Sequence, residues 1–518
     1  MLKKIIFFLV TLLASLYAAA DQGVAELWSD RYKGNANQSD GAASLVADSA
    51  GGVYITGSSS ESTGWLHATT IRYLNTGVRE WVDNYHITPN SNNEAHKIVL
   101  DDQNHAYVTL TTQEPPHQPN IMTLKYDPTG QLLWATPFDG PFKSTDYVHS
   151  LAVDTNANAY ITGSTLGPNS DNLFTIKYLP DGTQDWVNIY DGSDHTNENG
   201  WDIAVNQLGE AYVAGTIGTA TWSSLHGTYK YESDGKNISW IRDFPGGAAG
   251  GMAKSIDLDH HGNIYVTGYI VNSSGNNDFA SVMYNPDGTL AWSHLYDGPV
   301  NGRDEAVAIV YNEATGNVYV TGQSDGGTSD SDIVTILYDP TGKPIWINRY
   351  PGNAEKNDVP TALVIDNDGN AYVAGYITNA NDFTDYVVLK YNVSGKLIWT
   401  KIYDGPVHLN DFAEDIGLDQ DRNVYITGGS AGGGVPAKPD YDYFTIKYAQ
   451  YICGDANGDG KVGAADFFYL ISHVIFSGSA PKPVKEAGDA DGNGVVDGGD
   501  IWYLLFYFFG GSSPVCPP

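Results

Sequence analysis

Positive charge, sulfur and long apolar stretches are all scarce in this sequence. Its 27 lysine and arginine residues face 61 aspartate and glutamate residues, which gives a net charge of −34 at pH 7. Such a chain has no basic surface to neutralise phosphates, so nucleic acid is excluded as a partner. After the first twenty residues no run of about 18 apolar residues occurs, so we expect no membrane span. Only four methionines and two cysteines occur beside 35 tyrosines, 12 tryptophans and 58 glycines, a mixture that favours strands and turns over helices.

The chain begins like an exported protein. Lys3 and Lys4 precede an apolar stretch, Ile5–Leu16, and a small-residue cleavage site, Ala18–Ala20. That order is typical of a secretory signal peptide. We therefore expect residues 1–20 to be removed, and the mature protein to be secreted and either extracellular or associated with the cell surface.

Tryptophan marks an internal repeat. Eight tryptophans are spaced by 52 to 54 residues: Trp28, Trp81, Trp134, Trp186, Trp240, Trp292, Trp346 and Trp399. The same phrases recur around each of them, such as "NIYVTG" at 263–268 and "NVYITG" at 423–428. Self-similarity at a fixed period is the signature of a repeat architecture.

Each unit contains four short strand candidates joined by turns. The first is apolar (Leu363–Asp366), the second carries the "YVTG" phrase, the third reads like Phe174–Tyr178, and the fourth runs from the tryptophan (Trp399–Tyr403). Four strands per unit, repeated radially, describe the blades of a β-propeller. The first tryptophan strand precedes every other strand, so it is left to complete the eighth blade. We predict an all-β, eight-bladed β-propeller over residues 27–448, closed by the N-terminal strand.

This repeat resembles the bacterial SBBP-type β-propeller repeat family, through "GNxYVTG", "KYxxxG" and the tryptophan that follows. The resemblance covers about 420 residues and implies a fold without implying an activity. Eight-bladed quinoprotein dehydrogenases use a TGKxxW motif, which only Thr341–Trp346 matches in full. We interpret that match as turn and packing chemistry of a blade.

The C-terminal region contains two twelve-residue acidic loops, Asp455–Asp466 and Asp489–Asp500. Oxygen-bearing residues recur in them at the positions that calcium loops use, because a hard cation needs six or more oxygens around one point. The predicted ligands are Asp455, Asn457, Asp459, Lys461 and Asp466 in the first loop, and Asp489, Asp491, Asn493, Val495, Asp497 and Asp500 in the second. Lys461 and Val495 would contribute backbone carbonyls.

An apolar helix is predicted after each loop, over Phe467–Phe476 and Ile501–Phe509. This loop–helix, loop–helix order resembles the dockerin type I family. The resemblance implies a small α-helical domain over residues 453–516, two bound calcium ions and a cohesin-like protein partner. The sequence departs from cellulosomal dockerins at Ala464-Ala465 and Gly498-Gly499, where hydroxyl-bearing recognition residues are common.

The two cysteines, Cys453 and Cys516, bracket this domain. In an oxidising compartment an even pair suggests one disulfide, which would fasten the ends of a module too small for a large core. Two unpaired buried cysteines are the alternative interpretation.

Acidic residues recur near the start of the first strand in most blades. They are Asp40, Glu94 (one position late), Asp146, Glu198, Asp304, Asp358 and Asp411, whereas the fifth blade has Gly251. We expect them near the mouth of the central channel, where they would attract cations or a basic partner. The alternative is a structural role, in which they bind the backbone where one blade meets the next.

No catalytic motif stands out: the sequence has no GxSxG, no HExxH and no glycine-rich phosphate loop. Connections between second and third strands, such as Ser58–Thr69 and Tyr269–Asp278, vary in sequence and suggest a ligand-binding face. We predict a secreted binding or structural protein, with a propeller recognition head for a carbohydrate or protein and a calcium-dependent attachment module. The alternative is an extracellular carbohydrate-active enzyme, either a glycoside hydrolase or a lyase, that carries a dockerin.

Overall fold

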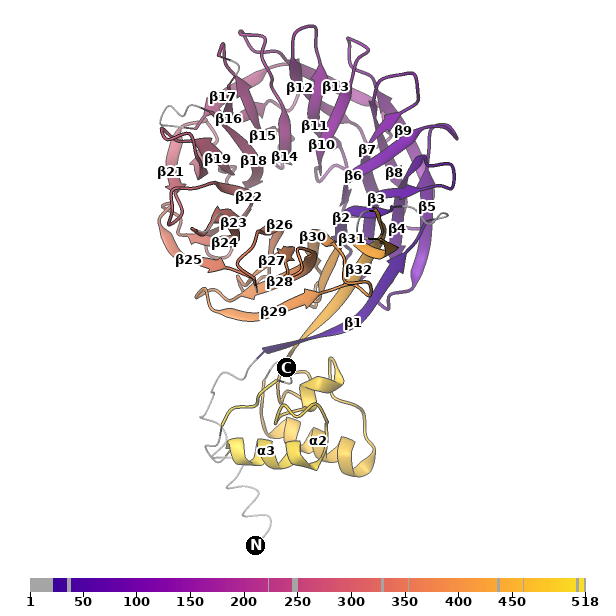
Figure 1. Ribbon diagram of the computed structural model, residues 1–518, viewed down its shortest axis with the longest axis vertical. Helices are drawn as coiled ribbons and strands as arrows, with labels where there is room; N and C mark the ends of the chain where they lie inside the picture. The colour runs from indigo at the N-terminus through magenta and orange to yellow at the C-terminus, as the bar shows by residue number, and fades with distance from the viewer. Residues whose placement is uncertain are drawn as a thin grey trace. The chain divides into compact units, whose positions relative to one another are not determined.

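The computed structural model describes residues 22–34, 39–221, 223–244, 250–327, 330–352, 354–435, 438–459, 461–508 and 512–516. The predicted signal peptide, residues 1–20, lies outside these ranges. Residues 30–419 and 425–445 form one compact unit; a second contains the residues from Ile446 onward, the chain up to Ser29, and residues 420–424. Figure 1 shows the first unit as a ring of blades around a central axis.

The described residues of the propeller form eight four-stranded antiparallel sheets, which confirms the predicted number of blades. The strands of blades one to four are β2 (Gly41–Ala47), β3 (Val53–Ser60), β4 (Leu66–Tyr73), β5 (Arg79–Tyr85), β6 (Asn92–Leu100), β7 (Ala106–Gln113), β8 (Asn120–Tyr126), β9 (Leu132–Phe138), β10 (Asp146–Val153), β11 (Ala159–Leu166), β12 (Asp171–Tyr178), β13 (Gln184–Tyr190), β14 (Gly200–Val205), β15 (Ala211–Gly218), β16 (Ser224–Tyr231) and β17 (Ile238–Asp243). Those of blades five to eight are β18 (Gly250–Leu258), β19 (Ile264–Val271), β20 (Asn277–Tyr284), β21 (Leu290–Tyr296), β22 (Asp304–Tyr311), β23 (Val318–Asp325), β24 (Ser331–Tyr338), β25 (Pro344–Tyr350), β26 (Asp358–Ile365), β27 (Ala371–Thr378), β28 (Thr384–Tyr391), β29 (Leu397–Tyr403), β30 (Asp411–Leu418), β31 (Val424–Val435), β32 (Lys438–Ile452) and β1 (Gln22–Tyr32).

The N-terminal strand closes the ring, as predicted. The last sheet has the order β1-β32-β31-β30, so β1 supplies the outer strand of blade eight (Figure 1). Arg31 in β1 donates to the carbonyl of Ser430 (2.9 Å) and to Asp442 Oδ2 (3.0 Å). Because both acceptors lie about 400 residues further along the chain, these bonds hold the two ends of the propeller together.

The recurring tryptophan of one blade packs against a recurring glycine of the next blade. Gly130 follows the third strand of blade two at a φ of 86°, and a Cβ there would lie 2.6 Å from the ring of Trp81 in the preceding blade. Gly342, within the single full TGKxxW match, meets Trp292 in the same way, at 2.5 Å. Only glycine tolerates both the left-handed backbone and the close approach. This glycine therefore serves the packing of one blade on the next.

Buried tyrosines also join neighbouring blades. The hydroxyl of Tyr160 donates to the carbonyl of Gly209 (3.3 Å), about fifty residues ahead in the next blade. Tyr319 makes the equivalent bond to Gly369 (2.5 Å), and Tyr425 makes it to Gly51 across the closure of the ring. In these blades the tyrosine of the repeat phrase thus supplies an apolar ring for the core between blades and a hydroxyl that satisfies a turn carbonyl.

The connections between second and third strands are shorter than the sequence suggested. The expected connection Tyr269–Asp278 is largely strand, because β19 continues to Val271 and β20 begins at Asn277. The backbone of Asn272 bonds to that of Asn276, so a tight turn replaces the longer loop. Polar residues at the strand ends, which resemble loop composition, caused this error.

The C-terminal region contains helix α2 (Ala464–Phe476), the 3₁₀ turn η1 (Lys485–Gly488) and helix α3 (Gly498–Phe508). Both helices begin three residues before the predicted starts. The reason is that Asp466 and Asp500 lie in the first turns and accept backbone N–H groups there. Among the residues that the structure describes, no helix has both the length and the apolar character needed to span a bilayer.

Candidate functional site

The second acidic loop brings its carboxylates together. Oxygen atoms of Asp489, Asp491 and Asp500 lie within 4.8 Å of one another. Asp500 is fully buried, and its Oδ1 accepts from the backbone N–H groups of Ala490 (2.7 Å) and Asp491 (3.2 Å). Its Oδ2 accepts from the N–H of Asp497 (2.7 Å). The last residue of the loop therefore fixes the first residues around a common point.

The first loop has the same construction. Asp455 Oδ1 accepts from the N–H groups of Gly458 (2.9 Å) and Asp459 (3.1 Å). Buried Asp466 accepts from Asn457 N–H (3.0 Å) through Oδ1 and from Gly463 N–H (2.7 Å) through Oδ2. These bonds fix the carboxylates of Asp455 and Asp466 within the loop. The predicted carbonyl ligand Lys461 follows Gly460, which lies outside the described residues.

The predicted ligands at the outer side of the second loop are open to solvent. Asn493 and Asp497 are exposed, and Val495 is 53% exposed. The N–H of Val495 donates to Asn493 Oδ1 (2.8 Å). Such an arrangement gives an ion access to the loop from one side.

Electrostatics in the loops favour a bound cation. Burial, together with nearby Asp455 and Asp459, raises the pKa of Asp466 to about 6. Burial likewise raises the pKa of Asp500 to about 6, with Asp491 as a second cause. At neutral pH these carboxylates are ionised at a cost that a divalent cation relieves. The oxygen-only donor set, carboxylate, amide and carbonyl, fits calcium.

The small domain has its own core. Ala456, Leu470, Ala490 and Leu504 are fully buried together between the loops and the helices. A disulfide joins Cys453 to Cys516, whose Cα atoms are 5.2 Å apart. The loops are therefore part of the core, so the ion sites and the stability of the domain depend on each other.

The recurrent acids of the propeller are mostly buried and bind the connections between blades. Asp146 Oδ2 accepts from the N–H of Gly140 (2.8 Å), six residues earlier, and Asp411 Oδ2 accepts from Gly405 (2.7 Å). The equivalent bonds are Asp40 to Gly34 (2.6 Å) and Asp304 to Gly298 (2.8 Å), while Asp358 accepts from Thr378 (3.1 Å). The four acids that bond to glycine thus hold the turns that link two blades, whereas Asp358 bonds to the end of β27 in its own blade.

Two of the recurrent acids differ from the others. Glu198 occupies the equivalent position, beside the glycine six residues earlier (Gly192), and burial raises its pKa to about 7. In blade two this position is held by Asn93 and not by Glu94. Asn93 is fully buried and donates to the carbonyl of Leu66 (3.2 Å). Glu94 is exposed and lines a hollow beside Phe412 and Glu414.

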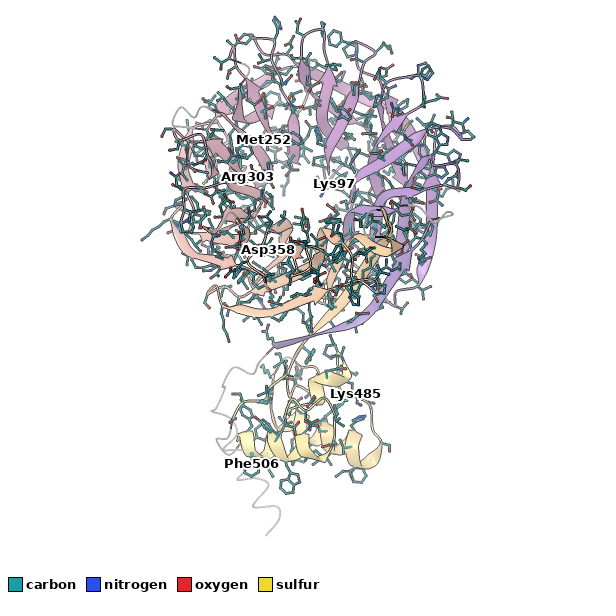
Figure 2. The ribbon with its side chains drawn as sticks, viewed as in Figure 1. Lys97, Met252, Arg303, Asp358, Lys485 and Phe506 are labelled. Carbon is teal, nitrogen blue, oxygen red and sulfur yellow. A yellow bond between two sulfur atoms is a disulfide. The ribbon has the colours of Figure 1, made fainter. Side chains whose placement is uncertain are left out.

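A β-bulge lines the central channel with side chains that the repeat does not dictate. In blades one to seven the pairing of the first two strands skips one residue of the first strand. The skipped residues and their equivalent in blade eight line a cavity of about 500 Å³: Ala43, His96, His149, Trp201, Lys254, Val307, Thr361 and Glu414. Lys97 follows the bulge of blade two at the inner side of the ring (Figure 2).

Three consecutive blades make an aromatic arc in this channel. The rings of His149 and Trp201 lie 4.3 Å apart, and the indole N–H of Trp201 is buried without a hydrogen-bond partner. Burial lowers the pKa of His149 to about 4 and also lowers that of His96, so both imidazoles are neutral at pH 7. In blade eight, burial raises the pKa of Glu414 to about 7. The channel therefore has aromatic faces, an unpaired indole N–H and a carboxyl group that is partly protonated at pH 7.

The comparison with known families agrees with this geometry. Residues 134–169 and 347–384 match the β-propeller repeat family (SBBP), and residues 453–507 match the dockerin type I domain. The chain combines SBBP-type β-propeller repeats with a C-terminal dockerin type I domain. Dockerin type I domains bind calcium and dock onto cohesins, and they are typical of extracellular or cell-surface proteins.

Individual relatives are distant. An uncharacterised WD repeat-containing protein of Acanthamoeba polyphaga mimivirus is 23% identical over 417 residues, which cover 65% of this chain and 29% of that protein. Sqt1 from Chaetomium thermophilum has a TM-score of 0.51 at 8% identity, covering 83% of this chain and 99% of that one. The WD40 domain of coronin from Toxoplasma gondii gives 0.46 at 10% identity, covering 88% and 92%. The likeness to Sqt1 concerns the propeller fold alone.

Proposed function

We propose that this is a secreted binding protein whose propeller recognises a ligand in its central channel. The dockerin type I domain, with one calcium ion in each loop, would attach that recognition head to a cohesin-like partner. The observation that carries this proposal is the ring of eight non-equivalent side chains in an otherwise repetitive channel. A purely structural ring has no need of His96, His149, Trp201 and Glu414 at its centre.

The channel chemistry favours a polysaccharide or oligosaccharide as the ligand. A sugar ring presents C–H groups that contact aromatic faces, and hydroxyls that need buried donors and acceptors. Trp201 and His149 supply the aromatic face, while the Trp201 indole N–H and Glu414 supply polar groups. The acidic surface of the whole chain disfavours polyanionic sugars, so neutral polysaccharides are the first candidates.

A screen of immobilised polysaccharides against the full chain in calcium tests this proposal. Binding to a neutral polysaccharide that is lost in Trp201→Ala and kept in Leu133→Ala would support it. Leu133 is 48% exposed on the outer strand β9, so it controls for an exposed apolar side chain removed elsewhere. Binding that survives Trp201→Ala would locate the ligand outside the channel.

A second candidate function is carbohydrate cleavage, and Glu414 is the observation that favours it. Its pKa of about 7 matches the requirement for a general acid, and Asp415 is adjacent in the same channel. Asp415 Oδ2, however, accepts from Ser44 Oγ (2.9 Å) and from Leu45 N–H (3.0 Å), which commits it to the neighbouring blade. Mass spectrometry of the screened sugars separates the two functions, because an enzyme would release fragments that Glu414→Gln no longer produces.

A further inference from the structure

The contact between blades five and six gathers three carboxylates. Asp278 at the start of β20, Asp297 directly after β21, and Asp304 at the start of β22 have oxygens within 4.8 Å of one another. Asp278 and Asp304 are buried, with 6% and 0% exposure, whereas Asp297 is exposed. One side of the cluster is therefore fixed in the protein and the other faces solvent.

Equivalent positions in other blades show what such an aspartate normally contacts. Asp332 in β24 pairs with Arg349 (2.7 Å), and Asp442 in β32 pairs with Arg31 (3.0 Å). In the register of blade five the place of Arg349 is taken by Leu295, because Leu295 pairs with Ala280 as Arg349 pairs with Val334. Asp278 thus lacks the guanidinium group that its two counterparts have.

The residue directly after the fourth strand differs between blades that have this arginine and blade five, which lacks it. It is Pro351 where Arg349 is present and Lys33 where Arg31 is present, but it is Asp297 in blade five. Aspartate also follows the fourth strand in blades two, three and seven, as Asp139, Asp191 and Asp404, but it is absent from blades six and eight, where the arginine is present. Three carboxylates in place of an ion pair are costly unless a cation joins them.

One buried oxygen of this cluster has no hydrogen-bond partner. Asp304 Oδ2 accepts from Gly298 N–H (2.8 Å), but Oδ1 has no partner with hydrogen-bond geometry, although the Ser324 hydroxyl lies beside it. Arg349 contacts that hydroxyl, but its Nη1 is committed to Asp332. Asp278 Oδ1 accepts from Asn272 Nδ2 (2.8 Å).

We propose that Asp278, Asp297 and Asp304 bind a hard divalent cation, calcium in an extracellular setting, at the contact between blades five and six. Three carboxylates supply part of the six to eight oxygens that calcium takes, and water completes the shell on the exposed side. Extracellular calcium sites of modest charge have dissociation constants of about 10⁻⁴–10⁻³ M. The ion neutralises Asp278 in blade five, as Arg349 neutralises Asp332 in blade six.

A similar cluster, Asp385, Asp404 and Asp411, lies between blades seven and eight. There, both oxygens of Asp411 accept backbone N–H groups, from Gly405 (2.7 Å) and Ala431 (3.2 Å). The proposal is therefore confined to the first cluster.

Equilibrium dialysis with calcium tests the proposal on the full chain. The parent protein carries Asp455→Asn and Asp489→Asn, which silence the dockerin loops, so the result is independent of calcium binding there. Into it we introduce Asp297→Asn, which alters only an exposed side chain and leaves the buried bonds in place. Asp139→Asn is the matched control, because Asp139 has the same position after the fourth strand of blade two.

The expected result is one ion fewer, or an affinity at least tenfold weaker, in Asp297→Asn than in both the parent and Asp139→Asn. The propeller of the parent should also melt at a higher temperature in 10 mM calcium chloride than in chelator, and Asp297→Asn should lose most of that increase. Equal calcium binding and equal melting shifts in the parent and Asp297→Asn would overturn the proposal. So would a parent that binds no calcium while its propeller remains folded by circular dichroism.

Discussion

Replacing Asp500 by alanine should unfold the dockerin domain while leaving the propeller intact. Its carboxylate accepts three backbone hydrogen bonds within the second calcium loop, from Ala490, Asp491 and Asp497. A hydrogen bond to a charged group is worth about 1.5–3 kcal/mol, so the loss is at least about 4 kcal/mol. A domain of this size rarely has more than about 3–5 kcal/mol of stability. The change also removes a calcium ligand, so added calcium should not rescue the fold.

Hydrogen exchange followed by mass spectrometry measures this on the full chain. In Asp500→Ala, peptides from α2 and α3 should lose protection, while those from the blades keep it. Asp497→Ala is the control for the loss of a predicted calcium ligand alone, because that exposed side chain accepts one hydrogen bond, from Gly499 N–H (2.6 Å), instead of three. Unchanged protection of α3 in Asp500→Ala would refute the reasoning, since the loop would then fold without the residue that ties it to the helix.

Three further predictions follow from single contacts. Tyr160→Phe should lower the free energy of unfolding of the propeller by about 1–3 kcal/mol, because it leaves the Gly209 carbonyl without its donor; urea denaturation followed by tryptophan fluorescence measures it. Burial raises the pKa of Glu414 from 4.5 to about 7, so the folded state holds this proton more tightly and the group's contribution to stability falls as pH rises from 5 to 8. The melting temperature of the wild type should therefore fall more over that range than that of Glu414→Gln. Cys453→Ser with Cys516→Ser should destabilise the dockerin domain by about 4 kcal/mol, since the bond closes a loop of 63 residues; a hydrogen-exchange comparison in calcium would show it, and equal protection would contradict it.

The number of blades and their closure were predictable because the repeat constrains them strongly. Six tryptophans, from Trp81 to Trp346, each meet a glycine of the next blade, as Trp81 meets Gly130, so their spacing in the sequence follows the spacing of the blades. The closing strand was predictable because Trp28 lacked a preceding first strand. The carboxylate cluster of the second acidic loop was predictable because loops that serve a hard cation keep a fixed spacing of oxygen-bearing residues.

The channel residues were not predictable in the same way. Alternation along a strand would place His96 and Lys97 on opposite faces, but the bulge between Ala95 and Lys97 brings both to the cavity. The sequence did contain a signal: the residue three positions after each recurrent acid varies from blade to blade, although the residues around it recur. Glu94 was misplaced for a related reason, since Asn93 holds the equivalent position and only the strand register reveals that.

The boundaries of the ligand-facing connections were also missed. Polar residues such as Asp278 read as loop in the sequence, although they begin a strand and point into the contact between blades. A buried carboxylate at a strand end satisfies its neighbours instead of water, and composition alone does not distinguish the two environments.

The affinity of the full chain for its best polysaccharide ligand, measured by isothermal titration calorimetry for the wild type, Trp201→Ala and Leu133→Ala, tests the central claim most directly. The account predicts at least a tenfold loss of affinity for Trp201→Ala and no change for Leu133→Ala, with all three proteins folded. Equal affinities for the wild type and Trp201→Ala would contradict it, and would remove the central channel as the recognition site.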